Sequence, residues 1–239
     1  MSCAAAIVVQ SASMSSAVPA AGVSTTMLAG DPSARSRARL GRDRVLAQIR
    51  EAAITEFSLH GFKGASTQAI AERAGLTKPQ LHYYIKGKDE LYEELLFAVL
   101  QGWSEAFAFD PSSDDPRRVL THYIHRKLAY ALDNPGLSRI FTNEILGGGP
   151  NLGRYWPIAQ RSTQDKVDLI DGWIAKGLMR PLNARLLLMH IWGMTQHYAD
   201  YAVQVRVMLG QAPDTPIDRE PIERELTEFV LRGCGFAPE

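Results

Sequence analysis

The chain has 239 residues, enough for two domains of ordinary size, and carries no formal net charge. Hydrophobic residues make up 46% and charged residues 22%, a composition that predicts a substantial core and excludes a chain disordered throughout. No run approaches the roughly 20 apolar residues that a membrane helix needs, so we expect no membrane contact.

Cysteine and histidine usage gives no indication of a metal site, a cofactor or an enzyme. Cys3 and Cys234, the two cysteines, lie near opposite ends of the chain, which excludes a disulfide framework. His122 and His125 stand three residues apart, but no cluster of Cys or carboxylate residues accompanies them. No nucleophile with a paired base and no phosphate-binding loop is recognisable. We therefore expect a non-enzymatic, cytoplasmic protein without metal or cofactor.

Residues 1–41 predict a disordered tail that ends in a basic arm. The first 30 residues carry no charged side chain, are rich in Ala, Ser and Val, and lack the positive start of a signal peptide. Met14 and Met27 are alternative translation starts within this stretch. Arginines then recur at Arg35, Arg37, Arg39, Arg42 and Arg44. Such a run is either a solvated linker or an arm that contacts DNA phosphates or a minor groove.

Residues 67–92 predict two short helices joined by a glycine-containing turn. Ser66 or Thr67 can cap the first helix, because a side-chain hydroxyl accepts hydrogen bonds from free N–H groups in the first turn. Gly75 stands where a helix end favours a left-handed residue, and Thr77 can cap the second helix. This arrangement is typical of a helix-turn-helix, in which the second helix enters the major groove of DNA.

The second helix of this unit offers a polar face for DNA. The side chains left for the groove and the backbone are those of Lys78, Gln80, His82, Tyr83 and Tyr84. Because Lys can donate to guanine acceptors and Gln can pair with adenine, we predict that Lys78, Gln80 and His82 reach base edges. We expect Tyr84 to be packed against the protein instead.

The distribution of charge agrees with a DNA-binding N-terminal half. Residues 31–92 contain 11 Lys and Arg against 7 Asp and Glu, whereas residues 93–239 contain 15 against 19. The segment with the predicted helix-turn-helix is therefore the basic one, as binding to phosphates requires.

The remainder of the chain predicts helices, because no segment shows the sustained two-residue alternation of a strand. The predicted helices cover residues 89–107, 117–132, 138–146, 155–175, 183–209 and 219–231. Stretches rich in proline or glycine separate most of them. The predicted fold class is therefore all-α.

Several fixed spacings in the N-terminal half carry a family resemblance. The matching residues are Phe57-x-x-x-Gly61-Phe62, Thr67-x-x-Ile70-Ala71, Ala74-Gly75-Leu76-Thr77-Lys78, Leu81-x-Tyr83-Tyr84 and Lys88-Asp89-x-Leu91. At these positions the chain resembles the TetR family of dimeric transcriptional regulators. The resemblance implies a helix-turn-helix, three-helix DNA-binding domain at residues 42–92 and a helical effector-binding and dimerisation domain at residues 93–239. It further implies a homodimeric repressor on palindromic double-stranded operator DNA.

The resemblance also bears on single residues. Thr67, Tyr83 and Lys88 match family positions that usually contact phosphates or frame the groove, so we predict that they fix the register on DNA. Ile85 and Gly87 depart from the family, whose members often have Phe and Ser there. Isoleucine still fills a core position, and glycine remains an acceptable cap.

A narrower resemblance covers most of residues 45–235. The segments 143–148, 172–174 and 191–202 are similar to the ligand domain of the RutR-like branch of the family, which includes regulators of pyrimidine utilisation that sense uracil or thymine. The resemblance implies a pyrimidine-like effector. The alternatives are another small molecule, such as a purine, another nitrogen catabolite or a drug, and a regulator without a ligand.

A stripe on the helix predicted at residues 183–209 fits such an effector. Its members, three or four residues apart, are Trp192, Thr195, Gln196 and Ala199. They offer an aromatic face, a hydroxyl and an amide, and an amide can pair with one N–H and one carbonyl of a pyrimidine. The alternative is that these polar groups satisfy one another or face a dimer partner.

A second candidate group flanks the glycine-rich break at residues 147–149. Its members are Asn143, Glu144, Tyr155 and Trp156. They predict either a flexible mouth of the ligand pocket or only a helix end with a surface tryptophan. The apolar helices at residues 183–209 and 219–231 are the predicted dimer surface, by resemblance and because their apolar residues exceed what one pocket needs.

Overall fold

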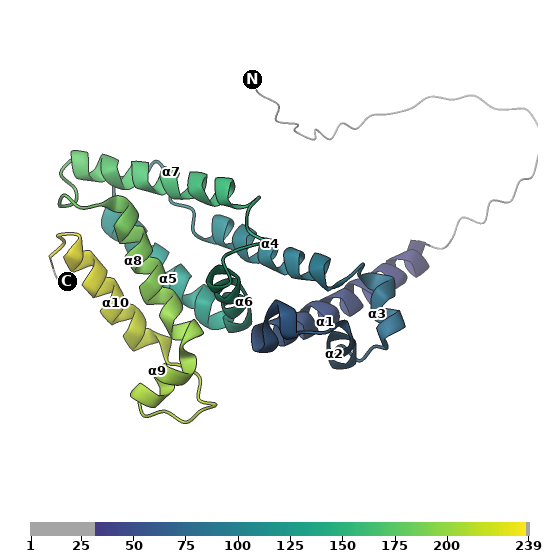
Figure 1. Cartoon of the computed structure of the whole chain (residues 1–239). Coiled ribbons are helices and arrows are strands. Elements are labelled where there is room, and N and C mark those ends of the chain that lie inside the picture. The colour runs from purple at the N-terminus through teal and green to yellow at the C-terminus, as the bar shows by residue number, and fades with distance from the viewer. Residues whose placement is uncertain (1–31, 238–239) are drawn as a thin grey trace, which may run out of the picture. The chain divides into compact units, whose positions relative to one another are not determined.

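The computed structural model describes residues 32–237, with side chains from residue 39 onward except at residues 104–106. The chain divides into two units, residues 1–40 and residues 41–239. All regular structure within the described residues is helical, as predicted (Figure 1). In chain order the helices are α1 (Pro32–Gly64), α2 (Thr67–Arg73), α3 (Lys78–Tyr84), α4 (Lys88–Ala106), α5 (Pro116–Asp133), α6 (Pro135–Leu146), α7 (Trp156–Ala175), α8 (Ala184–Asp200), α9 (Ala202–Met208) and α10 (Arg219–Gly233).

The predicted tail falls partly outside the described residues, to which residues 1–31 do not belong. Helix α1 begins at Pro32 and continues past the predicted boundary at residue 41. The arginines expected in an arm therefore stand on a helix. Alanine, arginine and leucine, which dominate this stretch, are among the residues that favour a helix most.

The turn chemistry predicted for the helix-turn-helix is present. Of the two candidate caps of α2, Ser66 is the one used, since its hydroxyl accepts from the backbone N–H of Ala69 at 3.1 Å. Gly75 has a φ of 70°, in the left-handed region where a side chain would cause strain. Thr77 caps α3 in a reciprocal capping box with Gln80.

A first core cluster, here the N-terminal cluster, joins α1–α4 to α6 and the α6–α7 loop. Its buried members are Ile49, Ala52, Ala53, Phe57, Ala65, Ile70, Ala71, Leu81, Leu91, Tyr92, Leu95, Leu96, Ile140, Leu152 and Tyr155. The predicted domain boundary between residues 92 and 93 thus lies inside α4 and does not separate two cores. Helix α6 adds Ile140 to the same core that holds the helix-turn-helix.

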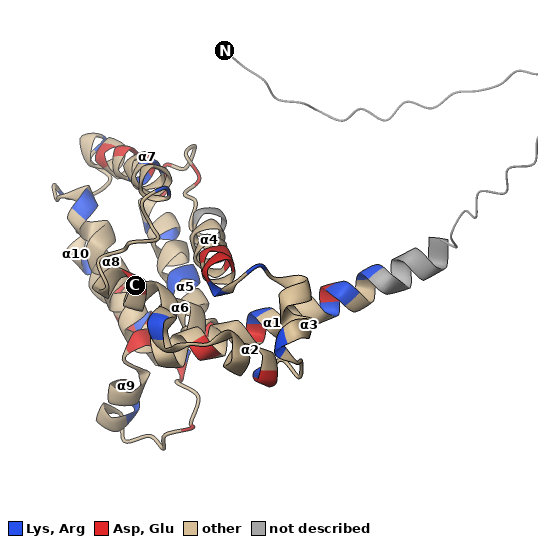
Figure 2. Cartoon of the chain, turned by 45° about the vertical axis from the view of Figure 1, so that its right-hand side comes forward, with Lys and Arg blue, Asp and Glu red and all other residues tan. Residues whose placement is uncertain are grey.

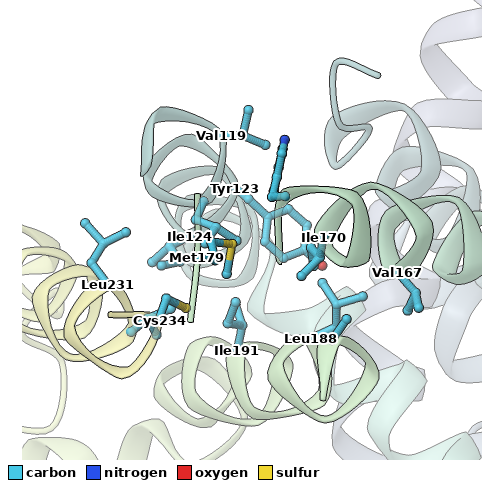
Figure 3. Packing of buried hydrophobic residues seen from close by; sticks show 14 of the residues in the cluster. Val119, Tyr123, Ile124, Val167, Ile170, Met179, Leu188, Ile191, Leu231 and Cys234 are labelled. Atoms are coloured by element: carbon cyan, nitrogen blue, oxygen red, sulfur yellow. The ribbon is translucent and has the colours of Figure 1, made fainter. Parts of the chain in front are cut away.

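A second core, the C-terminal cluster, lies among α5, α7, α8 and α10. Helix α5 packs against both α8 and α10. The side chains of Tyr123, Ile170 and Leu188 point into a shared interior (Figure 3). Trp173 is buried there as well, and its indole N–H donates to the carbonyl of Ser113 at 2.8 Å, which ties the loop before α5 to α7.

One predicted helix is wrong in length, whereas the other predicted helices of the C-terminal half agree with the structure to within three residues at each end. The helix expected over residues 183–209 is two helices, α8 and α9, which meet at Tyr201 with φ −105° and ψ 28°. The carboxylate of the preceding Asp200 accepts hydrogen bonds from α6, whereas α9 has one buried side chain, Val205. The apolar sequence runs through the break, but the packing that holds α8 straight ends there.

Candidate DNA-binding face and interior effector site

The exposed side of α3 brings the predicted base-reading residues together. Lys78, Gln80 and His82 are all exposed, and the Tyr83 side chain is 74% exposed. Leu81, on the opposite side, is fully buried and holds the helix in the N-terminal cluster. One face of α3 is therefore fixed and the other is open to a DNA groove.

Gln80 also belongs to the cap of its own helix. Its Oε1 accepts from the backbone N–H of Thr77 at 2.8 Å and from the Thr77 hydroxyl at 3.1 Å. The amide nitrogen of Gln80 has no described partner and can donate to a base. A bidentate contact with adenine also needs Oε1, so the hydrogen bonds of Oε1 to Thr77 would have to break first. Substitution of Gln80 therefore changes helix capping and DNA contact together.

Arg42 joins this face, although the sequence suggested only a general role in an arm. Its guanidinium carbon lies 6.0 Å from the ring centroid of Tyr83 and 5.7 Å from that of Tyr84. The two rings meet edge to face at 5.2 Å, and Tyr84 is half-buried. Basic positions recur along α1 near α3 (Figure 2). The arginine run signals this cation, but its spacing does not indicate which arginine meets α3.

Lys88, a predicted phosphate ligand, has its ammonium group bound inside the protein. Nζ donates to the carbonyl oxygens of Phe62 at 2.9 Å and Ala65 at 3.1 Å, and it lies 4.7 Å from the Phe62 ring centroid. One N–H of the ammonium remains, so the phosphate contact stays a prediction. Thr67, another predicted phosphate ligand, is half-buried in the first turn of α2.

The polar ends of the predicted stripe on α8 face α5 and α6. The indole N–H of Trp192 donates to the hydroxyl of Tyr123 at 2.6 Å. The amide nitrogen of Gln196 donates to the hydroxyl of Thr142 at 3.2 Å. Both side chains are half-buried, so these two members of the stripe lie where a small molecule can meet them.

The other two members of the stripe are buried and offer the interior little polar character. The hydroxyl of Thr195 donates to the carbonyl of Ile191 at 2.7 Å, inside its own helix. Ala199 is 1% exposed. Their role is to bring α8 close to its neighbours, whether or not a ligand also touches them.

A buried amine that sequence reasoning missed lies on α5, one turn after Tyr123, the partner of Trp192. Lys127 of α5 is 7% exposed, and its Nζ lies 4.7 Å from the ring centroid of Trp103 and 4.8 Å from that of Phe107. Burial lowers the pKa of Lys127 to about 8; the charge of Lys166 acts in the same direction and that of Asp200 opposes it.

The sequence contains a signal for this amine. Leu120, Tyr123, Ile124, Lys127 and Leu128 recur at three- and four-residue intervals and are all buried. A lysine at such a position stands on the apolar face of its helix, where its charge needs a partner that the local sequence does not supply.

Glu144, predicted to line a ligand pocket, links two parts of the fold. One carboxylate oxygen accepts from the hydroxyl of Tyr92 on α4 at 3.0 Å. The other accepts from the backbone N–H of Asn151 in the α6–α7 loop at 2.7 Å. Burial raises the pKa of Tyr92, and the nearby Glu144 charge raises it further.

The rest of this second candidate group is not placed with the stripe on α8. Tyr155 belongs to the N-terminal cluster, and its hydroxyl accepts from Arg154 at 2.6 Å. Asn143 is exposed, and Trp156 is 41% exposed. The sequence placed both groups near one effector, whereas Tyr155 packs in the N-terminal cluster and Trp192 against the C-terminal cluster.

Two clefts open beside the C-terminal helices. The larger, of about 850 Å³, runs along α7 and is lined by Phe109 and Lys166 among others. The second, of about 650 Å³, lies between α8 and α10 and is lined by Leu186, Met189 and Phe229 among others. None of the four stripe residues lines either cleft.

Residues 32–237 show no group of three or more His, Cys, Asp or Glu placed to hold a metal ion. In that same range, every helix is too short or too polar to cross a membrane.

Two family profiles match adjoining parts of the chain. The profile of the bacterial regulatory proteins of the tetR family matches residues 49–95. The profile of the C-terminal region of YcdC-like proteins matches residues 96–237. Together they cover the helix-turn-helix and nearly all of the C-terminal helices.

Curated relatives match both parts at once. The HTH-type transcriptional regulator RutR of Escherichia coli O157:H7 is 36% identical over 177 residues, which cover 74% of this chain and 82% of that protein. RutR of Escherichia coli strain K12 is 35% identical over the same shares of the two chains.

Solved structures agree on the fold. A putative transcriptional regulator of Streptomyces coelicolor, SCO4942, has a TM-score of 0.61 at 22% identity and covers 79% of this chain and 97% of its own. The ketosteroid transcriptional regulator KstR2 of Mycobacterium tuberculosis has a TM-score of 0.64 at 21% identity, over 78% and 93% of the two chains. With the capped helix-turn-helix, the all-helical fold and the matches over both halves, the chain belongs to the TetR family of DNA-binding transcriptional regulators.

Proposed function

We propose that the protein represses transcription as a homodimer on a palindromic operator and releases the DNA when a pyrimidine-like metabolite such as uracil or thymine binds between α5, α6 and α8. The observation that carries the effector is the pair Trp192 and Gln196, which present an indole and an amide to the same interior. Gln196 Oε1 has no described hydrogen bond, so the amide can accept from a ring N–H.

On DNA, α3 enters the major groove. Lys78 and His82 reach base edges, together with the amide nitrogen of Gln80. Tyr83 and Arg42, which lie at one end of the helix, contact the backbone and set the register. The cation–π contact holds Arg42 near this position before DNA arrives, which reduces the side-chain entropy lost on binding.

The dimer forms through α8 and α10. Leu186 and Met189 of α8 and Phe229 of α10 are exposed apolar side chains that line one cleft. An exposed apolar patch of this kind often marks a site where another protein binds. A two-fold axis through the same surface on both copies places two recognition helices on successive half-sites.

Helix α6 connects the effector site to the DNA-binding head. Towards α8, its Ser138 and Thr142 donate to the Asp200 carboxylate at 2.6 and 2.5 Å. Towards the head, Glu144 accepts from Tyr92. An effector that replaces the Gln196–Thr142 hydrogen bond therefore acts on a helix that shares a core with the helix-turn-helix. Coupling of this kind typically amounts to about 1–3 kcal/mol.

Thermal unfolding of the full chain tests the effector, because a ligand of the folded state raises the melting temperature. We expect uracil and thymine to stabilise the wild-type chain, whereas hypoxanthine and xanthine do not. The Trp192→Phe variant should lose most of the uracil-induced shift, and Trp156→Phe, which alters a tryptophan outside the interior, should retain it.

Other outcomes separate the alternatives. Stabilisation by the purines alone would replace the pyrimidine with another nitrogen catabolite. Operator binding without stabilisation by any of these compounds would contradict the proposed effector and favour a regulator with another ligand or none.

A further inference from the structure

Lys127 is enclosed by aromatic side chains rather than by acceptors. Its ammonium lies over the ring of Trp103, in α4, and the ring of Phe107, the residue that follows α4. Phe107 in turn meets Tyr123 at 6.0 Å and Tyr130 at 5.8 Å, in both cases edge to face. Helices α4 and α5 thus form an aromatic chamber around a single cationic group.

No described side chain accepts a hydrogen bond from this ammonium. The Asp200 carboxylate, whose negative charge acts on Lys127, already accepts from Ser138 and Thr142. The rings supply some cation–π stabilisation but no hydrogen-bond acceptor along the N–H directions. A buried ammonium without a hydrogen-bond acceptor is destabilising. We therefore expect a bound ligand to supply the acceptor.

A second polar group in the same chamber is also without a described partner. Tyr130 stands three residues after Lys127 on the same side of α5, and its hydroxyl forms no described hydrogen bond. Gly102 of α4 leaves the space that this hydroxyl uses, since a Cβ there would come within 3.2 Å of it. An amine and a phenol therefore share two aromatic neighbours, Trp103 and Phe107.

Both groups keep contact with accessible space. Among the described residues, the side-chain atoms that are both fully enclosed and without a hydrogen bond are Gln211 Oε1 and Thr227 Oγ1. The Lys127 ammonium and the Tyr130 hydroxyl also lack a described hydrogen bond but are not among these atoms, so each retains some accessible surface. The larger cleft approaches the chamber through Phe109, which lines it and whose ring lies 5.0 Å from that of Tyr123.

We propose that Lys127 and Tyr130 form the oxygen-binding end of the effector site, where they bind a ring carbonyl or carboxylate oxygen of a flat, small ligand held among the aromatic side chains. This proposal rests on the proposed function only in placing the effector in this interior. It adds the requirement that the ligand carry an exocyclic oxygen. A ring without such an oxygen gives the Lys127 ammonium no hydrogen-bond acceptor.

Binding to the full chain by isothermal titration calorimetry tests the requirement with four probes. Uracil carries two ring carbonyls, orotate adds a carboxylate to that ring, benzoate carries a carboxylate on a ring that is not a pyrimidine, and unsubstituted pyrimidine carries no exocyclic oxygen. The variants are Lys127→Met and Tyr130→Phe. The control is Lys176→Met, which removes an exposed lysine that pairs with Asp114 on the surface.

We expect the wild-type chain to bind at least one oxygen-bearing probe and to bind pyrimidine at least about tenfold more weakly. Lys127→Met should weaken the oxygen-bearing probe at least about tenfold and leave pyrimidine unchanged. Tyr130→Phe should weaken it by several-fold, and Lys176→Met should not change it. Thermal unfolding of each variant without ligand shows whether that variant is folded. If Lys127→Met does not fold, Tyr130→Phe provides the test.

The outcomes separate this inference from the proposed function. Equal affinity of uracil for the wild-type, Lys127→Met and Tyr130→Phe chains would overturn the inference and leave the pyrimidine effector in place. Binding of benzoate alone, with dependence on Lys127, would support the inference and remove the pyrimidine. Failure of all three oxygen-bearing probes to bind would overturn both.

Discussion

Lys86 and Lys88 stand two residues apart at the start of α4, yet they have different surroundings. Lys88 donates to two backbone carbonyls at the link between α1 and α2, whereas Lys86 forms an exposed ion pair with Glu90. Lys88→Ala leaves two carbonyls without their donor, so we expect it to lower the free energy of unfolding by about 1–3 kcal/mol. Denaturant unfolding measures this, and Lys86→Ala should match the wild type. Equal stability of both variants would contradict the contacts of Lys88.

Lys127 makes stability depend on pH in a definite direction. Burial lowers its pKa from 10.5 to about 8, so between these values the unfolded chain binds more protons than the folded one. Stability therefore rises with pH through this window, and the penalty at pH 7 is on the order of 3 kcal/mol. We expect Lys127→Met to remove that penalty, so its advantage over the wild type in denaturant unfolding should shrink between pH 7 and pH 10. An advantage that is independent of pH, or absent, would argue against a buried cation.

Individual residues differ in how far the sequence reveals them. Ser66, Gly75 and Thr77 act within three residues of their own positions, so local spacing is sufficient to identify them. Lys127 depends on rings about 20 positions earlier in the chain, on α4, and local spacing can show only that it stands on a buried face. The hydrogen bond of Glu144 with Tyr92 joins residues 52 positions apart, so local spacing does not reveal it.

The recognition helix α3 has only seven residues and depends on its cap. Thr77→Ala removes the hydroxyl half of the capping box, which accepts from the backbone N–H of Gln80, and this should lower the free energy of unfolding by about 1 kcal/mol. Because the first turn of α3 is then held less firmly, we also expect weaker DNA binding in a fluorescence anisotropy titration. Thr77→Ser, which keeps the hydroxyl, should behave as the wild type does. An Ala variant with unchanged stability would mean that the cap contributes nothing.

Helix α6 is the element that should carry the effector signal. Tyr92→Phe removes the hydroxyl that joins α4 to Glu144, while Glu144 keeps its two contacts with Asn151. We expect the variant to bind uracil and operator DNA separately, but to show a smaller effect of uracil on DNA affinity. Tyr201→Phe, at the exposed junction of α8 and α9, serves as the control. Full coupling in Tyr92→Phe would exclude this hydrogen bond from the route.

At the level of helices, the sequence predicted most elements well because apolar periodicity and proline or glycine stops are local. The exceptions are the start of α1 at Pro32, within the predicted tail, and the α8–α9 break at Tyr201, which interrupts a continuous apolar run. At this break the end of α8 is held by long-range contacts, since the hydrogen bonds of Asp200 come from Ser138 and Thr142 on α6. Periodicity alone contains no information about that contact.

The dimer surface proposed on α8 and α10 is testable with one charge. Phe229→Glu places a carboxylate in the cleft between these helices, where a partner copy would have to bury it. We expect sedimentation velocity to show a monomer, and DNA affinity to fall because one recognition helix binds alone. Leu146→Glu, an equally drastic change at a side chain that is 79% exposed on α6, should leave the dimer intact. A dimeric Phe229→Glu variant would move the interface elsewhere.

For the whole molecule, the DNA-binding head could be predicted from the sequence more completely than the effector site. The DNA-binding head is one contiguous stretch with fixed spacings, so its fold and its exposed face follow from about 45 residues. The proposed effector site draws on α4, α5, α6 and α8, and the stripe at Trp192 and Gln196 indicates only one of its walls. Residues that flank a glycine-rich break suggested another wall; of these, Tyr155 belongs to the core of the head, whereas Asn143 and Trp156 are exposed.

The central claim is that effector and operator compete through a shared conformational change, and one titration tests it directly. The operator is first selected from a random DNA pool by the wild-type dimer. Uracil affinity is then measured by calorimetry with the free dimer and with the dimer saturated by that DNA. Because coupling is reciprocal, we predict that DNA weakens uracil binding by a factor of about 5–150. Equal uracil affinity in the two states would contradict the account.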